Sequence, residues 1–188
     1  MSRAADTIDD SRPFIPIRFA VLTVSDTRTR ADDRSGDTLA ERIAAAGHHL
    51  ADRAIVSDDK EAIAATVSRW IEDAGVDVVI TTGGTGFTGR DVTPDAIEPL
   101  FEKRMDGFAA LFHRISYETI GTSTVQSRAT AGLAGGTFIF VLPGSTGACR
   151  DGWDGIIASQ FDYRHRPCNF VEIMPRLDEH LKRGKLQG

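Results

Sequence analysis

Three apolar runs rich in β-forming residues limit the folds open to this chain of 188 residues. They are residues 17–24 (IRFAVLTV), 77–82 (DVVITT) and 137–142 (TFIFVL), and each is predicted to form a buried strand. In residues 77–82 the apolar side chains occupy consecutive positions, which is typical of a strand covered on both faces. Such a strand needs helices on both sides of its sheet, so the chain is expected to have an α/β fold.

Helical spacing between these runs gives the order of the predicted elements. A helix is expected to start at Asp37, its N-cap, and to end at Gly47, and residues 49–56 are predicted to form the next strand. A second helix is expected from residues 57–61 to Gly75. The order strand, helix, strand, helix, strand favours a mostly parallel sheet with helices on both sides.

The later part of the chain repeats these signals. Thr93 is predicted to cap a helix whose first residue is Pro94, and further helix is expected through residues 108–115. After the strand at 137–142, helical spacing returns at residues 152–161. The chain then becomes rich in Arg and Pro and is expected to end in a short amphipathic helix.

The chain is expected to form one domain with an N-terminal arm. Residues 1–13 are polar and are expected to form a mobile arm, and residues 14–188 are expected to form one domain, since no repeat or linker divides them.

Composition and charge exclude several classes of protein. With a net charge of −5, the chain lacks the basic footprint of a nucleic-acid-binding protein. Cys149 and Cys168 form no CxxC pair, so both are predicted to be reduced thiols. Neither a signal peptide nor a membrane-spanning run is found, so the expected compartment is the cytoplasm, with no membrane partner.

The most informative stretch is Val78–Ile97 (VVITTGGTGFTGRDVTPDAI), in which Gly84–Gly89 fits the pattern G-x-G-x-x-G. Three features weigh against a dinucleotide fingerprint. The pattern follows the third predicted strand, no acidic residue ends another strand about 20 residues later, and Arg90–Val92 separates the glycines from the helix start. A dinucleotide-dependent enzyme is therefore the last of the interpretations kept open.

The same glycines suit a phosphate. Gly83, Gly84 and Gly86 leave backbone N–H groups uncovered, and successive N–H groups form a nest for an anion. The loop also follows the carboxyl end of a strand, where open α/β sheets bind ligands. Asp91 would repel a bare phosphate, but it is suited to hold Mg²⁺ or to position an attacking group. The alternative is a glycine-rich turn in which Asp91 caps the nearby helix.

Polar residues follow the other predicted strands and would reach the same edge of a parallel sheet. Ser25 and Asp26 follow the first strand, Asp58 and Asp59 follow the second, and Ser145 follows a later one. One of the aspartates is also expected to cap a helix, and Ser145 is placed either to cap a helix or to hold a phosphate. Four strand ends therefore supply small, polar or acidic residues to one candidate site.

These residues resemble the MoaB/Mog family of molybdenum-cofactor biosynthesis proteins, whose domain is also found in gephyrin and the MoeA proteins. TTGGTGFTGRDVTPDAI and a second motif at residues 142–153, LPGSTGACRDGW, carry the resemblance. IGTSTVQSRATAG at residues 120–132 and RHRPCNF at residues 164–170 narrow it to the MoaB branch. The resemblance covers residues 17–170, which is nearly the whole chain.

The resemblance implies a three-layer αβα sandwich with a mostly parallel central sheet, assembled as a homotrimer or a hexamer. It implies binding of molybdopterin, a pterin dithiolene with a terminal phosphate, and transfer of AMP from Mg²⁺-bound ATP to that phosphate, with release of pyrophosphate. Asp58 and Asp91 would be the acidic pair and would hold the Mg²⁺, while Arg90 would offset phosphate charge or face solvent. The substrate pocket would be lined by Ser25, Asp26, Thr82, Gly83, Gly84, Thr85, Gly86, Pro94, Gly144 and Ser145. Other proteins of molybdenum-cofactor biosynthesis are further candidate partners.

Two alternatives to a molybdopterin adenylyltransferase stay open on the sequence alone. The first is a protein that binds molybdopterin or a precursor without catalysis, although the intact GRDVTPD at residues 89–95 favours the enzyme. The second is a structural oligomer in which residues 1–13 cross between subunits. Two departures from the family pattern matter. Residues 106–108 read DGF where the family often has Pro-Gly-Phe before the second helix. Residues 145–147 (STG) differ from the Lys- or Gln-bearing Mog versions, which implies a different pterin end of the site.

Overall fold

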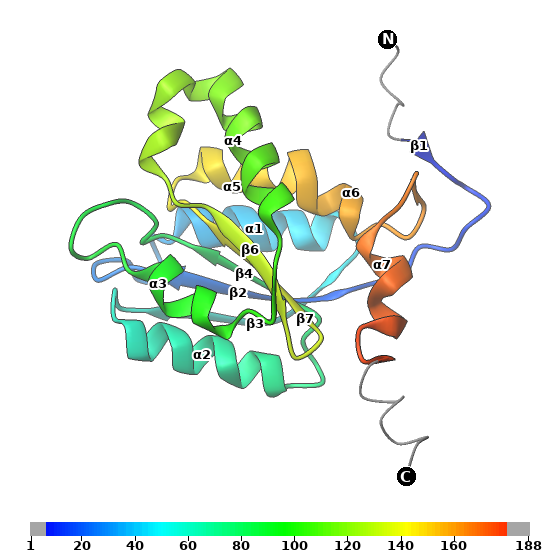
Figure 1. Cartoon of the computed structure of the whole chain (residues 1–188), viewed down its shortest axis with the longest axis horizontal. Coiled ribbons are helices and arrows are strands. Elements are labelled where there is room, and N and C mark those ends of the chain that lie inside the picture. The colour runs from blue at the N-terminus through cyan, green and yellow to red at the C-terminus, as the bar shows by residue number, and fades with distance from the viewer. Residues whose placement is uncertain (1–6, 180–188) are drawn as a thin grey trace.

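The computed structural model describes residues 7–179, which form a six-stranded sheet between two layers of helices (Figure 1). The strand order is β3-β2-β4-β7-β6-β5, and the first four of these strands run parallel. Their bounds are β2 (Arg18–Val24), β3 (His49–Val56), β4 (Val78–Thr82), β5 (Lys103–Arg104), β6 (Thr130–Ala134) and β7 (Thr137–Leu142). The predicted α/β fold with a mostly parallel central sheet is confirmed.

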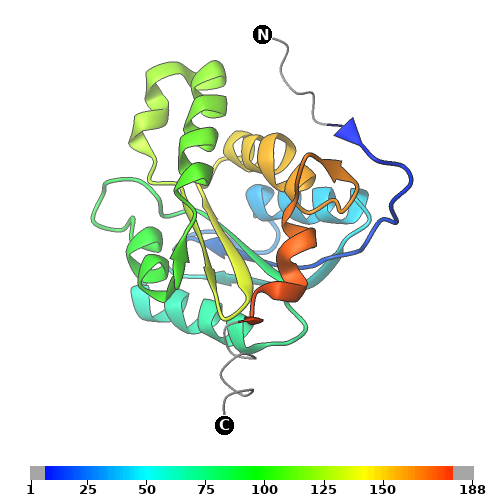
Figure 2. The ribbon, with the colours of Figure 1, turned by 45° about the vertical axis from the view of Figure 1, so that its right-hand side comes forward.

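Helices cover both faces of this sheet, as Figures 1 and 2 show from two directions. One face carries α1 (Arg34–Ala45), α4 (Asp106–Ile120) and α5 (Thr146–Gly152), and the other carries α2 (Lys60–Glu72) and α3 (Thr93–Ile97). Shorter turns complete the described chain: η1 (Glu98–Leu100), η2 (Gly121–Gln126), the π-helical η3 (Trp153–Ile157), α6 (Ala158–Gln160), α7 (Phe170–Ile173) and η4 (Met174–Arg176). No helix in residues 7–179 is long and apolar enough to cross a membrane.

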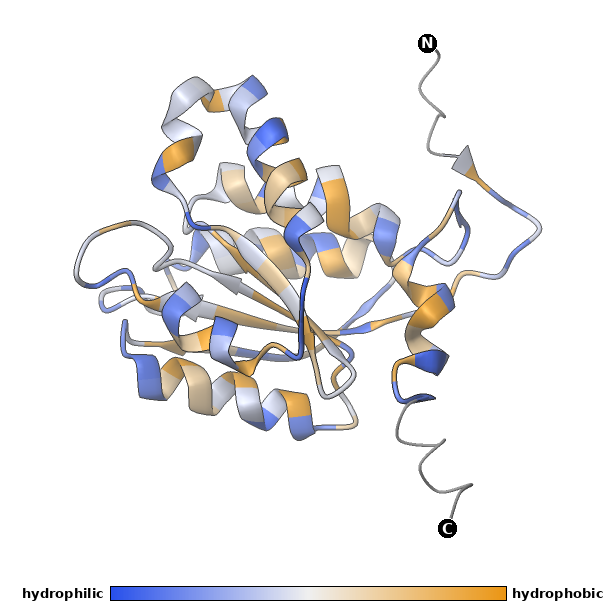
Figure 3. Cartoon of the chain, viewed as in Figure 1, coloured by the Kyte–Doolittle hydropathy of each residue, from blue (hydrophilic) through white to orange (hydrophobic). Residues whose placement is uncertain are grey.

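Successive side chains of the parallel strands enter two separate cores. Phe19 and Val21 of β2 pack with Leu39 of α1, whereas Ala20 and Leu22 face the core under α2 and α3. Every residue of β4 is buried, and orange residues run along the central strands in Figure 3. Burying one large apolar side chain contributes about 1.5–3 kcal/mol, so both cores hold the sheet in place. Coverage on both faces is the physical cause of the consecutive apolar positions in the sequence.

Two local expectations were wrong, and one strand was missed. Helix α1 begins before Asp37, because Asp33 is its N-cap and accepts a hydrogen bond from the Gly36 N–H at 3.0 Å. Thr93 does not cap α3: Val92 precedes the helix, and the Thr93 hydroxyl donates to the carbonyl of Gly83 at 2.8 Å. Strand β6, which pairs antiparallel with β7, was not predicted at all.

The two ends of the described chain lie against each other. Strand β1 (Thr7–Ile8) pairs antiparallel with β8 (His165–Arg166), and Arg12 donates to the Tyr163 carbonyl at 2.8 Å and to Glu172. Residues 7–13 of the expected mobile arm are therefore joined to the C-terminal part of the chain, while residues 1–6 lie outside the described residues. Residues 14–179 supply the six-stranded sheet and the helices on its two faces, and the single domain over residues 14–188 stays a prediction.

Candidate functional site

The predicted site residues gather at one edge of the sheet, where the carboxyl ends of the parallel strands meet. Ser25 and Asp26 follow β2, Asp58 follows β3, the glycine loop of residues 83–89 follows β4, and Gly144 follows β7. This is the edge at which open α/β sheets bind their ligands. The strand-end edge, meaning these loops together, is therefore the candidate site.

Asp26 and Asp58 tie the ends of β2 and β3 together. The Asp26 N–H donates to Asp58 Oδ2 at 2.9 Å, and the Asp58 N–H donates to Asp26 Oδ1 at 3.0 Å. Arg90, from the glycine loop, donates through Nε to Asp26 Oδ2 at 2.9 Å. The hydrogen bond from Arg90 holds the pKa of Asp26 below its ordinary value. Asp26 therefore has a cationic partner of its own.

Asp58 stands in a different electrostatic environment. Its pKa is raised by burial and by the negative charges of Asp26 and Asp91, and the Asp26 N–H and the charge of Arg90 oppose this only in part. A carboxylate whose pKa is raised by like charges gains stability when a cation binds beside it. The environment of Asp58 is therefore suited to a metal ion.

Asp91 folds back onto its own loop. Its Oδ2 accepts from the Thr88 hydroxyl at 2.6 Å and from the Thr88 N–H at 2.9 Å. These bonds, led by the hydroxyl, lower the pKa of Asp91, so the side chain is ionised at neutral pH. A Cβ atom at position 86 would lie 2.8 Å from Asp91 Oδ2, so only glycine lets the carboxylate approach so closely. Asp91 does not cap α3, which has no side-chain cap.

The glycine loop offers backbone donors to an anion. Gly83 and Gly84 have φ of +106° and +65°, a region that favours glycine. A Cβ atom at position 84 would lie 2.4 Å from Thr93 Oγ1 and 3.1 Å from Asp58 Oδ1. The Gly83 N–H donates to the Leu142 carbonyl at 3.1 Å, and the Gly86 N–H donates to the Asp91 carboxylate. The N–H groups of Gly84 and Thr85 have no partner within residues 7–179 and are available for a phosphate.

Arg128 holds the glycine loop through hydrogen bonds, a role that the sequence analysis did not predict. Its Nε donates to the Gly86 carbonyl at 2.9 Å, its Nη1 to Asp95 at 2.9 Å and its Nη2 to the Asp91 carbonyl. Its own N–H donates to the Thr85 carbonyl at 2.9 Å. Arg128 lies in the stretch IGTSTVQSRATAG, whose sequence indicates the family resemblance but no site residue. Its contacts fix the loop that carries Asp91.

On the β7 side, two predicted site residues are engaged in the fold. The Thr82 hydroxyl donates to the Pro143 carbonyl at 2.9 Å and lies 3.3 Å from Cys149 Sγ. Ser145 Oγ accepts from the Ala148 N–H at 3.0 Å and caps α5. Both described cysteines are free thiols, and burial raises the pKa of Cys149 to about 11, so its thiol stays protonated and unreactive. Pro94 is buried within α3.

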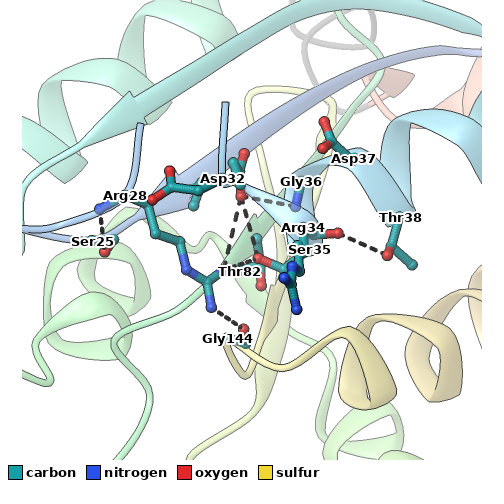
Figure 4. A network of polar contacts seen from close by, with 12 residues as sticks. Ser25, Arg28, Asp32, Arg34, Ser35, Gly36, Asp37, Thr38, Thr82 and Gly144 are labelled. Carbon is teal, nitrogen blue, oxygen red and sulfur yellow. Dashed lines mark hydrogen bonds and ion pairs between the residues drawn. The ribbon is translucent and has the colours of Figure 1, made fainter. Parts of the chain in front are cut away.

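Arg28 reaches the same edge from the loop after β2 and was also not predicted. Figure 4 shows its side chain among Thr82, Ser35 and Gly144. Its Nη2 donates to the Gly144 carbonyl at 3.1 Å, and its Nη1 donates to the Ser35 hydroxyl. The guanidinium thus joins the end of β7 to the start of α1.

The acidic residues do not form a complete metal site by themselves. Within residues 7–179 no group of three His, Cys, Asp or Glu side chains is arranged to hold a metal ion. Asp58 and Asp91 could supply two oxygen ligands beside the glycine loop, and the remaining ligands would come from a phosphate or from water. That division is usual for Mg²⁺ bound with nucleotides.

Comparison with known proteins agrees with this geometry. Residues 20–162 match the family described as a probable molybdopterin binding domain. Molybdenum cofactor biosynthesis protein B of Escherichia coli (strain K12) is 53% identical over 160 residues, covering 85% of this chain and 94% of that protein. The protein of the same name from Bacillus subtilis (strain 168) is 45% identical over 135 residues, covering 71% and 79%.

Solved structures show the same relationship. A crystal structure of a molybdenum cofactor biosynthesis protein B superimposes with a TM-score of 0.77 at 42% identity, covering 79% of this chain and 93% of that chain. The tungsten cofactor synthesizing protein MoaB from Pyrococcus furiosus superimposes with a TM-score of 0.71 at 39% identity, covering 78% and 93%. The chain therefore belongs to the MoaB/Mog family of molybdenum-cofactor biosynthesis proteins, in its MoaB branch.

Proposed function

We propose that the strand-end edge binds molybdopterin and Mg²⁺-bound ATP and transfers AMP to the terminal phosphate of molybdopterin. One observation carries the proposal: Asp58 lies beside Gly84 and Asp91 lies beside Gly86, in a loop that also presents two unpaired N–H groups. Carboxylates and phosphate donors placed together suit a metal-bound nucleotide. Membership of the MoaB family supports the pterin as the second substrate.

The proposed reaction is a displacement at the α-phosphate of ATP. An oxygen of the pterin phosphate forms a bond to the α-phosphorus, and the bond from that phosphorus to the oxygen bridging the β-phosphate breaks. Pyrophosphate leaves with the bonding electrons, and no oxidation or reduction occurs. The nucleophile is already an anion and needs no strong base, so catalysis depends on alignment and on charge neutralisation.

The residues of the edge divide these tasks. Asp91, ionised at neutral pH, and Asp58 would hold the Mg²⁺ that enters with ATP, and the metal would neutralise charge on the phosphates. The N–H groups of Gly84 and Thr85 would bind phosphate oxygens. Arg128 would keep Asp91 in place through the Gly86 and Asp91 carbonyls.

The test is AMP transfer by purified protein supplied with molybdopterin, Mg²⁺ and ATP, with the adenylylated product measured by chromatography. Asp91→Asn is expected to lower the rate by about 100-fold or more, because it removes a charge aimed at the reacting phosphates, while molybdopterin binding is retained. Asp106→Asn removes the same charge from a remote side chain that is 84% exposed, and its rate should match wild type.

Two outcomes would contradict the proposal. Unchanged turnover in Asp91→Asn would remove that residue from the reaction. No product from the wild-type protein, with molybdopterin still bound, would leave a protein that binds the pterin without catalysis.

The proposed assembly is a homotrimer or a hexamer. Helix α4 and the adjoining η2 expose four large apolar side chains, and exposed apolar surface is suited to an interface between subunits. They are Leu111, Tyr117, Ile120 and Val125, with 41%, 58%, 53% and 69% exposed. Light scattering after size exclusion should give three or six times the mass of one chain, and a monomer would contradict the proposal.

A further inference from the structure

Arg28 differs from the other arginines near the strand-end edge in what it binds. Arg90 donates to Asp26, Arg128 donates to Asp95, and Arg53 donates to Asp33 and pairs with Asp37. Among the residues that the structure describes, Arg28 donates hydrogen bonds only to neutral oxygens, those of Ser35 and Gly144. A guanidinium has more N–H donors than these two bonds use.

The nearest carboxylate to Arg28 is already satisfied. Asp33 Oδ1 lies 3.9 Å from Arg28 Nη1, beyond hydrogen-bond distance. Asp33 accepts instead from Arg53 at 2.7 Å, from the Thr23 hydroxyl at 2.8 Å and from the Gly36 N–H at 3.0 Å. Within the described chain Arg28 is therefore paired with Asp33 only at 3.9 Å and without a hydrogen bond, and its charge also helps to lower the pKa of Asp32. Its guanidinium keeps N–H donors that no carboxylate uses, and 34% of its side chain is exposed.

Arg28 is connected to the glycine loop through Gly144. Its partner Gly144 packs so closely on this loop that a Cβ atom at position 144 would lie 3.2 Å from the Cα of Gly83. The N–H groups of Gly84 and Thr85 follow directly in the chain. The edge thus has an acidic side, with Asp26, Asp58 and Asp91, and a basic side at Arg28.

We propose that Arg28 binds the phosphate monoester of the pterin substrate. The inference rests on the proposed function and assigns one residue to one substrate: the acidic side receives the metal-bound nucleotide, and Arg28 receives the second phosphate. The planar guanidinium matches two phosphate oxygens, and this pairing holds the nucleophilic phosphate beside the glycine loop.

The test compares two ligands with three full-length proteins. The ligands are molybdopterin and molybdopterin whose phosphate has been removed by a phosphatase, and the proteins are wild type, Arg28→Gln and Arg30→Gln. Arg30 is exposed in the same loop, so its variant controls for the loss of one positive charge. Equilibrium binding is measured at constant salt, and the KM for ATP is measured in the transfer assay.

Removal of the phosphate is expected to weaken binding to wild type and to Arg30→Gln by about 10-fold or more. This is the change in affinity that corresponds to the loss of one hydrogen bond to a charged group. Arg28→Gln should bind intact molybdopterin about 10-fold or more weakly than wild type does. Removal of the phosphate should then change the affinity of this variant little. A purely structural role of Arg28 would weaken both ligands equally. The same dependence on the phosphate in Arg28→Gln as in wild type would therefore overturn the inference.

The remaining outcomes separate the inference from the proposed function. A raised KM for ATP in Arg28→Gln, with pterin affinity unchanged, would assign Arg28 to the nucleotide and overturn the inference alone. A wild-type protein that binds the pterin through Arg28 but forms no product would overturn AMP transfer and leave the inference standing. A wild-type protein that binds no molybdopterin would overturn both.

Discussion

Two aspartates at the same edge of the sheet, Asp33 and Asp58, have opposite surroundings. Asp33 is fully buried. Burial acts to raise its pKa, but hydrogen bonds from Arg53, Thr23 and the Gly36 N–H outweigh burial and lower it. Asp58 is close to Asp26 and Asp91 and has its pKa raised by burial and by their charges.

The difference separates a structural carboxylate, Asp33, from Asp58, the one that the proposal places in the site. The counter-charge of Asp33 is Arg53, which is part of the fold. Loss of the Asp33–Arg53 pair should therefore unfold the protein rather than change the rate of AMP transfer. Within residues 7–179 Asp58 has no hydrogen bond or ion pair with a cationic side chain, and it lies beside a loop with N–H groups that have no partner there. Its counter-charge is therefore expected to arrive with a ligand. The presence of a carboxylate does not by itself identify a binding site. A carboxylate whose matching positive charge is absent from the fold is the better candidate for one.

The largest effect is expected from breaking the buried pair. Arg53→Met leaves the buried Asp33 without its hydrogen-bonded cation, since Arg28 stands 3.9 Å away, and the free energy of unfolding should fall by about 3–5 kcal/mol in urea titrations. Transfer by the protein that stays folded should be retained. The matched control is Arg69→Met, whose arginine is 66% exposed and lies 3.8 Å from Asp52; its cost should stay below about 1 kcal/mol. An equal loss in the free energy of unfolding for Arg53→Met and Arg69→Met would contradict the structural role given to the Asp33–Arg53 pair.

Asp58→Asn should show the reverse pattern. AMP transfer should fall by about 100-fold or more, because a ligand of the metal-bound nucleotide is lost. The free energy of unfolding should stay the same or rise, because a like charge beside Asp26 and Asp91 is removed. Urea titration and the transfer assay on the same preparation check both halves. Loss of stability with full transfer would make Asp58 a structural residue like Asp33.

Asp26→Asn should move the pH dependence of transfer. Metal binding needs Asp58 ionised, so activity should rise as the pH passes upward through the pKa of Asp58. The negative charge of Asp26 helps to raise that pKa, so its removal lowers the pKa and the acid limb of the profile should shift to lower pH. Rates measured across the acid range would show the shift, and an acid limb at higher pH would contradict it.

Arg90→Gln should give the smallest effect, in the opposite direction. The charge of Arg90 lowers the pKa of Asp58, and Arg90 also neutralises Asp26. Its removal therefore raises the pKa of Asp58, and the acid limb should shift to higher pH. The effect is small because 66% of the Arg90 side chain is exposed and solvent screens its charge. A shift in the same direction as in Asp26→Asn would show that the two residues do not act through Asp58.

The sheet, and the meeting of the candidate residues at one edge of it, could be predicted because their signals are local. Strands β4 and β7 are continuous apolar runs, and the ends of β2, β3, β4 and β7 led to Asp26, Asp58, the glycine loop and Ser145. Strand β6 was missed because its sequence, TAGLA, consists of small residues and one leucine, and it is a strand because it pairs with β7.

The missed residues depend on contacts between distant parts of the chain. The stretch DTRTRADDRSGD, residues 26–37, has the composition of a solvated loop, yet Asp33 is buried because Arg53 of β3 pairs with it. Arg28 contacts Gly144 at a separation of 116 positions, and Arg128 contacts Gly86 at a separation of 42. No local pattern predicts which arginine of such a loop faces a site. The metal-binding roles of Asp58 and Asp91 stay predictions.

The measurement that tests the central claim most directly is Mn²⁺ binding, because it reports the cation at the acidic side without any turnover. Free Mn²⁺ would be followed by electron paramagnetic resonance in the presence of ATP, with wild type, Asp58→Asn, Asp91→Asn and Asp106→Asn. The account predicts one Mn²⁺ held by the wild-type protein with ATP, binding weakened by about 10-fold or more in the first two variants, and no change in Asp106→Asn. Equal Mn²⁺ affinity in all four proteins would contradict it.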